Sequence, residues 1–319
     1  MPKPLMVRQE LLALDLTGKV YIITGANSGI GLVTAQQLAT QGATVVMACR
    51  RVAEANDAAN GIHAAIGSAK LDVMALDLGD LASVRQFAAA FQDRYDRLDG
   101  LVNNAGVMNT PSGRTKDGFE LQFGINHLGH FLLTALLTDI LKDSAPSRVV
   151  IVSSSFHEQA VGRKAMIHFD DLNYEHRKYD GWEAYAQSKL ANVLHARALA
   201  HHLAGTGVVT GSLHPGWVRT NLFRTTMPLW LHNHAMAPIF RMAGMIEPWE
   251  GTQTTLHVLL APEVVGQSGS FFAQAGGPFK DKTAKRGGWP MLSPNPIARD
   301  DAVAERLWTV SAELTGAPA

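Results

Sequence analysis

Short runs of apolar and β-branched residues recur along the chain from residue 19 onward, and stretches with helical spacing separate most of them. A short run that is apolar on both faces is typical of a strand in a parallel sheet covered by helices. The predicted strands are Lys19–Thr24, Thr44–Cys49, Asp72–Leu76, Gly100–Asn103, Arg148–Ser153, Val208–Leu213 and Ser270–Ala273. Because crossovers between parallel strands are right-handed, this alternation predicts a doubly wound α/β sheet of about seven strands with helices on both faces.

Two segments interrupt the alternation. Residues 155–182 are polar and irregular, which predicts an insertion before a long helix. Residues 220–248 are rich in Met, Trp, Phe and Pro and predict a lid or substrate-binding arm. Neither has the composition of an interdomain linker. The sequence therefore predicts an N-terminal extension over residues 1–16 and a single domain over residues 17–319.

Composition narrows the classes of function. The 319 residues are 46% hydrophobic and 18% charged, and Lys+Arg balance Asp+Glu at 28 each, so no basic field favours nucleic acid. Cys49, the single cysteine, excludes an internal disulfide and suits a reducing compartment. No run approaches the roughly 20 apolar residues that span a bilayer, and residues 1–16 lack a long apolar stretch, so we do not expect them to act as a signal peptide. We expect a cytoplasmic protein without a transmembrane segment.

A glycine-rich segment follows the first predicted strand directly and reads Thr-Gly-Ala-Asn-Ser-Gly-Ile-Gly over residues 24–31. Glycine allows the backbone to turn tightly and to approach a pyrophosphate, and the N-terminus of the next helix attracts the anion. This context favours a Rossmann-type dinucleotide site over a plain strand-to-helix turn. The candidate phosphate-binding residues are Gly25, Asn27, Ser28, Gly29, Ile30 and Gly31.

The spacing T-G-x-x-x-G-x-G, with three further motifs in order, resembles the short-chain dehydrogenase/reductase family. The motifs are Asn103-Asn104-Ala105-Gly106, Tyr185-x-x-x-Lys189 and Pro215-Gly216. The resemblance extends over about residues 17–275 and implies an oxidoreductase that transfers a hydride between a nicotinamide and an alcohol or carbonyl. Four local strings resemble the retinol-dehydrogenase-like and WW-domain-oxidoreductase-like branch: Met47–Arg50, Asn126–Phe131, Ser188–Asn192 and His214–Gly216.

The end of the second strand bears on the choice of cofactor. Arg50 and Arg51 follow it, and no acidic residue occurs before Glu54. A carboxylate at this point binds the ribose 2′-hydroxyl of NAD, whereas arginine accommodates the 2′-phosphate of NADP. We therefore expect NADP(H), with Arg50 as the main phosphate ligand; the alternatives are Arg51 or a solvated turn. The resemblance implies further cofactor contacts at Asp77, Leu78, Asn103, Ala105, Gly106, Pro215, Gly216, Val218 and Thr220.

Tyr185 and Lys189 are four residues apart, so on a helix they share one face. A free tyrosine has a pKa of about 10, and a nearby ammonium would lower it. The pair predicts that Tyr185 serves as the acid/base, and the resemblance implies that Lys189 also holds the nicotinamide ribose. Tyr174 and Lys178 have the same spacing, but their segment lacks the apolar stripe of a core-facing helix.

Two further catalytic candidates follow from the resemblance. Ser154, at the end of the fifth strand, matches the serine that hydrogen-bonds the reacting oxygen, with Ser155 as the alternate. Asn126 matches the asparagine of the family's proton relay. No metal site is expected, since no carboxylate or cysteine cluster joins His232 and His234.

The apolar composition of residues 220–248 predicts a bulky, neutral, hydrophobic alcohol or carbonyl substrate of retinoid, steroid or aryl type. One alternative is an enzyme like the light-dependent protochlorophyllide reductases, although the cysteine typical of that family two positions after the lysine is Ala191 here. The other is a catalytically idle NADP-binding regulatory protein. Assembly into a homo-oligomer stays open.

Overall fold

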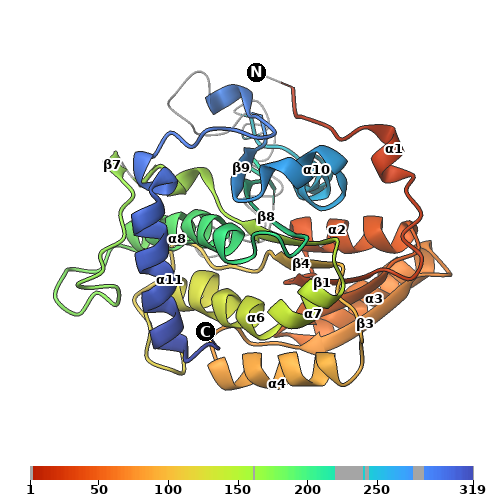
Figure 1. Cartoon of the computed structure of the whole chain (residues 1–319), viewed down its shortest axis with the longest axis horizontal. Helices are drawn as coiled ribbons and strands as arrows, with labels where there is room; N and C mark the ends of the chain where they lie inside the picture. Colours follow the sequence, from red (N-terminus) through yellow and green to blue (C-terminus); the bar gives the residue numbers. More distant parts are fainter. Residues whose placement is uncertain (1–2, 161, 220–239, 241–243, 276–283, 319) are drawn as a thin grey trace.

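A parallel sheet of seven strands forms the centre of the computed structural model, which describes residues 3–160, 162–219, 240, 244–275 and 284–318 (Figure 1). The strands are β1 (Val20–Thr24), β2 (Thr44–Cys49), β3 (Lys70–Ala75), β4 (Gly100–Asn103), β5 (Ser147–Val152), β8 (Val208–His214) and β9 (Ser270–Ala273). Their order is β3-β2-β1-β4-β5-β8-β9, and every neighbouring pair is parallel. The predicted doubly wound sheet is confirmed, with strand ends shifted by at most two residues.

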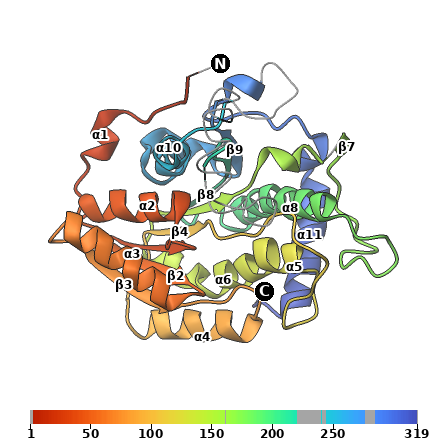
Figure 2. The same ribbon diagram turned by 180° about the vertical axis from the view of Figure 1, so that it is seen from behind.

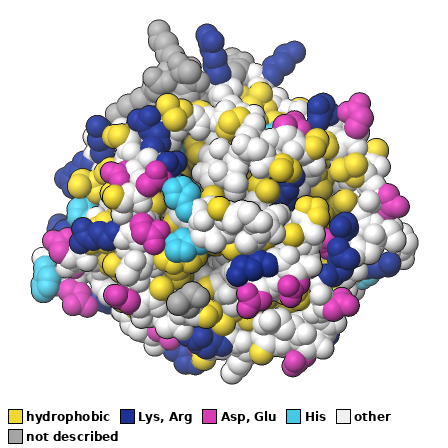
Figure 3. Space-filling view, viewed as in Figure 1, with side chains coloured by type: hydrophobic (Ala, Val, Ile, Leu, Met, Phe, Trp, Pro, Cys, Tyr) yellow, Lys and Arg dark blue, Asp and Glu magenta, His cyan; other side chains and the backbone are white. Residues whose placement is uncertain are grey.

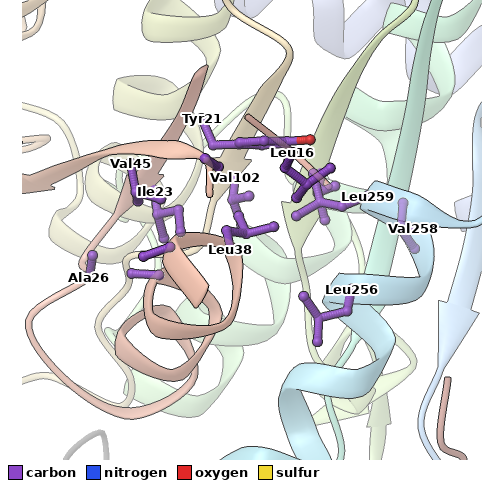
Figure 4. Close-up of a cluster of buried hydrophobic side chains, with 14 of the residues drawn as sticks. Leu16, Tyr21, Ile23, Ala26, Leu38, Val45, Val102, Leu256, Val258 and Leu259 are labelled. Atoms are coloured by element: carbon purple, nitrogen blue, oxygen red, sulfur yellow. The ribbon is translucent and has the colours of Figure 1, made fainter. Parts of the chain in front are cut away.

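Helices cover both faces of this sheet (Figures 1 and 2). Side chains of β2 alternate between two apolar clusters, with Val45 and Met47 in one and Val46 and Ala48 in the other. The first cluster is completed by α2 (Gly29–Thr40), α3 (Val52–Ala65) and α10 (Pro248–Leu260). Figure 4 shows Leu38 of α2 and Leu256 of α10 in this cluster. The second cluster is completed mainly by α4 (Leu81–Gln92), α6 (Gly129–Leu136), α7 (Thr138–Asp143) and α8 (Gly181–His202).

A third apolar cluster joins α8 to the C-terminal helix α11 (Asp301–Thr315). Because α11 covers α8 on the side away from the sheet, α8 is buried nearly all round (Figure 2). Short elements complete the chain: α1 (Gln9–Leu12), α5 (Leu121–Phe123), the π-helix η1 (Gly124–Leu128), the 3-10 turns η2 (Ser155–His157), η5 (Pro262–Gln267), η6 (Ala284–Arg286) and η7 (Pro296–Arg299), and the hairpin β6 (Gln159–Ala160) and β7 (Arg163–Lys164).

The N-terminal segment lies against the domain. Val7, Leu11 and Leu16 are buried in the first cluster, and the Val7 amide donates to Gln253 Oε1 at 3.2 Å. The predicted insertion at residues 155–182 contains η2 and the β6–β7 hairpin, and α8 begins directly afterwards. Most of the predicted arm at 220–248 lies outside the described residues.

Charged side chains of both signs are interspersed over the face shown in Figure 3. Among the described residues, no helix combines the length and apolar character needed to cross a bilayer.

Candidate active site

A cavity of about 520 Å³ lies where the loops after the strands meet. This is the edge at which doubly wound sheets bind their ligands. The predicted residues that line it are Gly25, Asn27, Ser28, Gly29, Ile30, Arg50, Arg51, Asp77, Leu78, Ala105, Gly106, Ser154, Tyr185, Lys189, Pro215, Gly216 and Val218. Residues separated by almost 200 positions in the sequence therefore share one cavity.

Three predicted residues lie behind the cavity wall, and a fourth cannot be placed. Gly31 is packed against the loop, Asn103 donates from Nδ2 to Thr134 Oγ1 at 2.8 Å, and Asn126 lies in η1. The Asn103 side chain faces α6 and joins the sheet to that helix, and the expected contact of this residue with the cofactor stays a prediction. Thr220 lies outside the described residues.

The loop between β1 and α2 has the geometry of a phosphate cradle. Gly25 has a φ of 68°, and a Cβ there would lie 3.1 Å from Ala105. A Cβ on Gly31 would lie 2.6 Å from the Gly25 carbonyl oxygen, so both positions require glycine. In the described part of the chain, no side chain caps the N-terminus of α2. Its first amide groups and the positive end of its dipole are thus available to an anion, and the loop fits a dinucleotide pyrophosphate.

The two arginines after β2 differ in their partners. Arg51 forms an ion pair with Glu54 at 2.7 Å, and the same carboxylate accepts from Asn27 Nδ2 at 3.2 Å. Arg50 is exposed, lines the cavity and forms no ion pair with the residues that the structure describes. Arg50 therefore offers the guanidinium that is free to bind a further anion.

Tyr185 and Lys189 lie one turn apart on α8, and both side chains are buried. Lys189 Nζ lies 5.8 Å from the centroid of the Tyr185 ring and donates to the Val152 carbonyl at 3.0 Å. Burial lowers the pKa of Lys189 to about 8 and raises the pKa of Tyr185 to about 12, while a hydrogen bond with Ser154 acts in the opposite direction on the tyrosine. Burial therefore shifts the pKa of Tyr185 in the direction opposite to the expected lowering, because the phenolate would lose its hydration inside the protein.

Ser154, rather than Ser155, faces Tyr185. The Ser154 side chain hydrogen-bonds Tyr185, and its Oγ accepts from the Phe156 amide at 3.3 Å. The Ser155 amide donates to His214 Nδ1 at 3.1 Å and thereby fixes the same loop to the end of β8. Ser153 is turned away, since its hydroxyl donates to the Lys189 carbonyl.

Asn126 lies in the π-helix η1, a local widening of a helix that is often found at functional sites. Its Oδ1 accepts from the Val107 amide at 2.8 Å, and its Nδ2 donates to the Val107 carbonyl and to Ser188 Oγ, both at 2.9 Å. Ser188 in turn donates to the Tyr185 carbonyl. Asn126 therefore connects the β4 loop to the helix that carries Tyr185 and Lys189.

Tyr174, the second tyrosine with a lysine four residues later, does not line the cavity. Its backbone is left-handed, with a φ of 56°, and the Arg177 guanidinium lies over its ring at 4.1 Å. This geometry belongs to a loop rather than a helix.

Aromatic residues that sequence reasoning missed form the wall beside Tyr185. The Phe156 ring stacks on Trp182 at 5.0 Å and meets the Tyr185 ring edge-on at 5.6 Å. Val107, Met108, His214 and Trp217 also line the cavity. Phe156 and Trp182 fall in the polar segment 155–182, whose lack of periodicity concealed them. Over the described ranges, no group of three or more His, Cys, Asp or Glu residues is placed to hold a metal ion.

Comparison with known proteins agrees with this geometry. The sequence model of a family described as short chain dehydrogenase matches residues 19–166. Human retinol dehydrogenase 12 is 46% identical over 302 residues, which cover 95% of this chain and 88% of that protein.

Solved structures extend the comparison to the fold. An uncharacterised protein from Mycobacterium paratuberculosis superposes with a TM-score of 0.73 at 35% identity, covering 96% of this chain and 97% of the other. RhlG of Pseudomonas aeruginosa, solved as an active-site complex with NADP, superposes with a TM-score of 0.64 at 25% identity, covering 82% and 96%. The chain therefore belongs to the short-chain dehydrogenase/reductase family of nicotinamide-dependent oxidoreductases, in its retinol-dehydrogenase-like branch.

Proposed function

We propose that this protein is an NADP(H)-dependent oxidoreductase that interconverts a bulky hydrophobic alcohol and the corresponding ketone or aldehyde, with Tyr185 as the acid/base. The proposal rests on one observation, that the candidate catalytic residues and the candidate cofactor-binding residues line the same cavity. Ser154, Tyr185 and Lys189 meet at an aromatic wall, while the glycine loop and Arg50 line the same cavity.

When bound, the nicotinamide would supply the hydride in reduction and accept it in oxidation. The Ser154 hydroxyl orients the substrate oxygen by a hydrogen bond, and Tyr185 gives that oxygen a proton in reduction and removes one in oxidation. Because the pKa of Tyr185 is about 12, the phenol is protonated at neutral pH, the form that reduction requires. Lys189, with a pKa of about 8, is mainly an ammonium at neutral pH and stabilises negative charge on the tyrosine oxygen as the proton leaves.

Three features support a hydrophobic substrate. Phe156 and Trp182 line the cavity beside Tyr185, and Trp217 is a further aromatic residue of its lining. The sequence of residues 220–248 carries charge only at Arg224, Arg241 and Glu247, so a multiply charged substrate would find few partners there. The similarity to a retinol dehydrogenase points to the same class, because retinol is a long apolar alcohol.

Two features support NADP(H) over NAD(H). Arg50 lines the cavity without an ion-pair partner among the described residues, and the 2′-phosphate is the group that an arginine at this position binds. RhlG, which shares the fold, was solved with NADP.

The test is a series of straight-chain aldehydes with NADPH, followed by the fall in NADPH absorbance. Each buried methylene contributes about 0.8 kcal/mol, so kcat/KM should rise up to about fourfold per methylene until the cavity is full. A flat series, or a preference for sugars, would contradict the substrate class. NADPH binding without turnover of any carbonyl would instead support the idle NADP-binding protein.

A further inference from the structure

His157 lies next to Ser154 in the fold but does not line the cavity. It ends the 3-10 turn η2, and its side chain is fully buried. Its backbone amide donates to the Ser154 carbonyl at 3.1 Å, and its ring Nδ1 contacts the same oxygen at 2.5 Å. Two groups of His157, its backbone amide and its ring, therefore hydrogen-bond the carbonyl oxygen of Ser154.

The other ring nitrogen is held by the C-terminal part of the chain. His157 Nε2 lies 2.7 Å from the hydroxyl of Ser293, which is also buried. A carbonyl cannot donate, so Nδ1 carries the hydrogen and Nε2 accepts from the serine. Burial lowers the pKa of His157 to about 4, and the ring is neutral at physiological pH, as this pattern requires.

Asn295 fixes the same loop from the same side. Its Nδ2 donates to the His157 carbonyl at 2.9 Å and to the Ala165 carbonyl at 3.1 Å. The Asn295 amide donates to Ser293 Oγ, and the Met291 amide donates to Phe271 of β9. Residues 291–295 are thus joined both to the sheet and to the loop that follows β5.

The loop after β5 carries two residues that contact Tyr185, namely Ser154 and Phe156. Ser154 hydrogen-bonds Tyr185, and Phe156 packs between Tyr185 and Trp182. Ser154 Oγ accepts from the Phe156 amide, so a rotation of the Ser154 peptide would displace the serine hydroxyl and the aromatic ring together.

We propose that His157, held by Ser293 and Asn295, is a positioning residue that fixes Ser154 and Phe156 against Tyr185. The inference rests on the proposed function, since it assigns Ser154 the task of orienting the substrate oxygen. It makes residues 293–295, more than 130 positions after the serine, part of the catalytic geometry.

The test compares Ser293→Ala with Ser311→Ala. Ser311 is a matched control, because its buried hydroxyl lies 2.8 Å from Nε2 of another buried histidine, His127, which contacts α11 and does not line the cavity. Both variants should lower the melting temperature. Only Ser293→Ala should lower kcat, by roughly tenfold, because a small misplacement of catalytic groups is costly, while the KM for NADPH stays the same. Ser293→Cys keeps the side chain close to its original size, but a thiol is a weak hydrogen-bond donor. Its kcat should therefore lie between those of the wild type and Ser293→Ala.

A second readout separates positioning from a loss of stability. In alcohol oxidation, kcat/KM rises as Tyr185 deprotonates, and a weaker bond from Ser154 should move this rise to higher pH in Ser293→Ala and Ser293→Cys but not in Ser311→Ala. Wild-type kcat and an unshifted pH profile in the folded Ser293 variants would overturn the inference. A wild-type chain that turns over no carbonyl would instead contradict the proposed function.

Discussion

Tyr185 and Lys189 show how one cause acts oppositely on two side chains. Burial disfavours the charged form of each, so the pKa of the tyrosine rises to about 12 while that of the lysine falls to about 8. The spacing of the two residues could be predicted from the sequence, because a separation of four places side chains on one helix face. The sign of the tyrosine shift could not, since it depends on how completely other elements exclude water.

Arg50 and Arg51 should differ in how strongly they affect the binding of NADPH. Arg50→Ala should weaken NADPH binding by about tenfold, the lower end of the effect of a charge-assisted bond, because Arg50 is exposed. NADH binding should not change, since NADH lacks the 2′-phosphate. Dissociation constants from fluorescence titration provide the measurement.

Arg51→Ala is the control for this change, because Arg51 is already paired with Glu54. It should affect NADPH less than Arg50→Ala does. A larger effect at Arg51 would move the phosphate ligand to that residue, and an equal loss of both cofactors in Arg50→Ala would contradict a role in cofactor choice.

Among the secondary-structure elements, the strands of the sheet could be predicted from the recurrence of short apolar runs alone. β2, β4 and β9 have the predicted bounds, because a short apolar run between turns specifies a buried strand. The glycine loop was equally predictable, since its function depends on local backbone geometry. The burial of α8 nearly all round was not, because α11, the helix that covers it, lies far away in the sequence.

Other residues of the candidate site could not be predicted, because they lie in segments without a regular pattern of apolar positions. Phe156 and Trp182 lie in a polar stretch, and only the folded chain brings their rings together beside Tyr185. Nothing in the local sequence links Ser293 and Asn295 to the site, because the contacts that fix the loop after β5 are with the ring and the carbonyl of His157. Contacts of this kind leave no periodic trace in a sequence.

On the scale of the whole molecule, buried histidines make stability depend on pH. Burial lowers the pKa to about 3 for His127 and His214 and to about 4 for His130 and His157, and it lowers that of His195 as well. An unfolded histidine has a pKa of about 6.5. Above that pH both states are neutral, whereas between about 6.5 and 4 only the unfolded chain binds these protons, so stability falls as the pH falls.

We predict that the free energy of unfolding decreases below pH 6.5 by about 1.4 kcal/mol per pH unit for each such histidine. Urea denaturation at pH 7, 6 and 5 measures this slope. His195→Phe should reduce this slope by the contribution of one histidine, about 1.4 kcal/mol per pH unit, without loss of stability at pH 7. Neither ring nitrogen of His195 has a hydrogen-bond partner in the described structure, and the rings of Phe131 and Trp308 lie 5.1 and 6.0 Å away. Stability that is constant from pH 7 to 5 would contradict neutral burial of these rings.

The kcat of Tyr185→Phe, measured beside that of Tyr174→Phe, shows whether Tyr185 is the acid/base that we propose for this NADP(H)-dependent oxidoreductase. Each change removes one phenolic hydroxyl that precedes a lysine by four residues, but only Tyr185 lies in the cavity. With NADPH and a long-chain aldehyde, Tyr185→Phe should lose about 10²- to 10⁴-fold in kcat with NADPH affinity unchanged, and Tyr174→Phe should keep wild-type turnover. A Tyr185→Phe enzyme that turns over within about threefold of wild type, a difference on the order of 0.6 kcal/mol in barrier height, would contradict the role of Tyr185 as the acid/base.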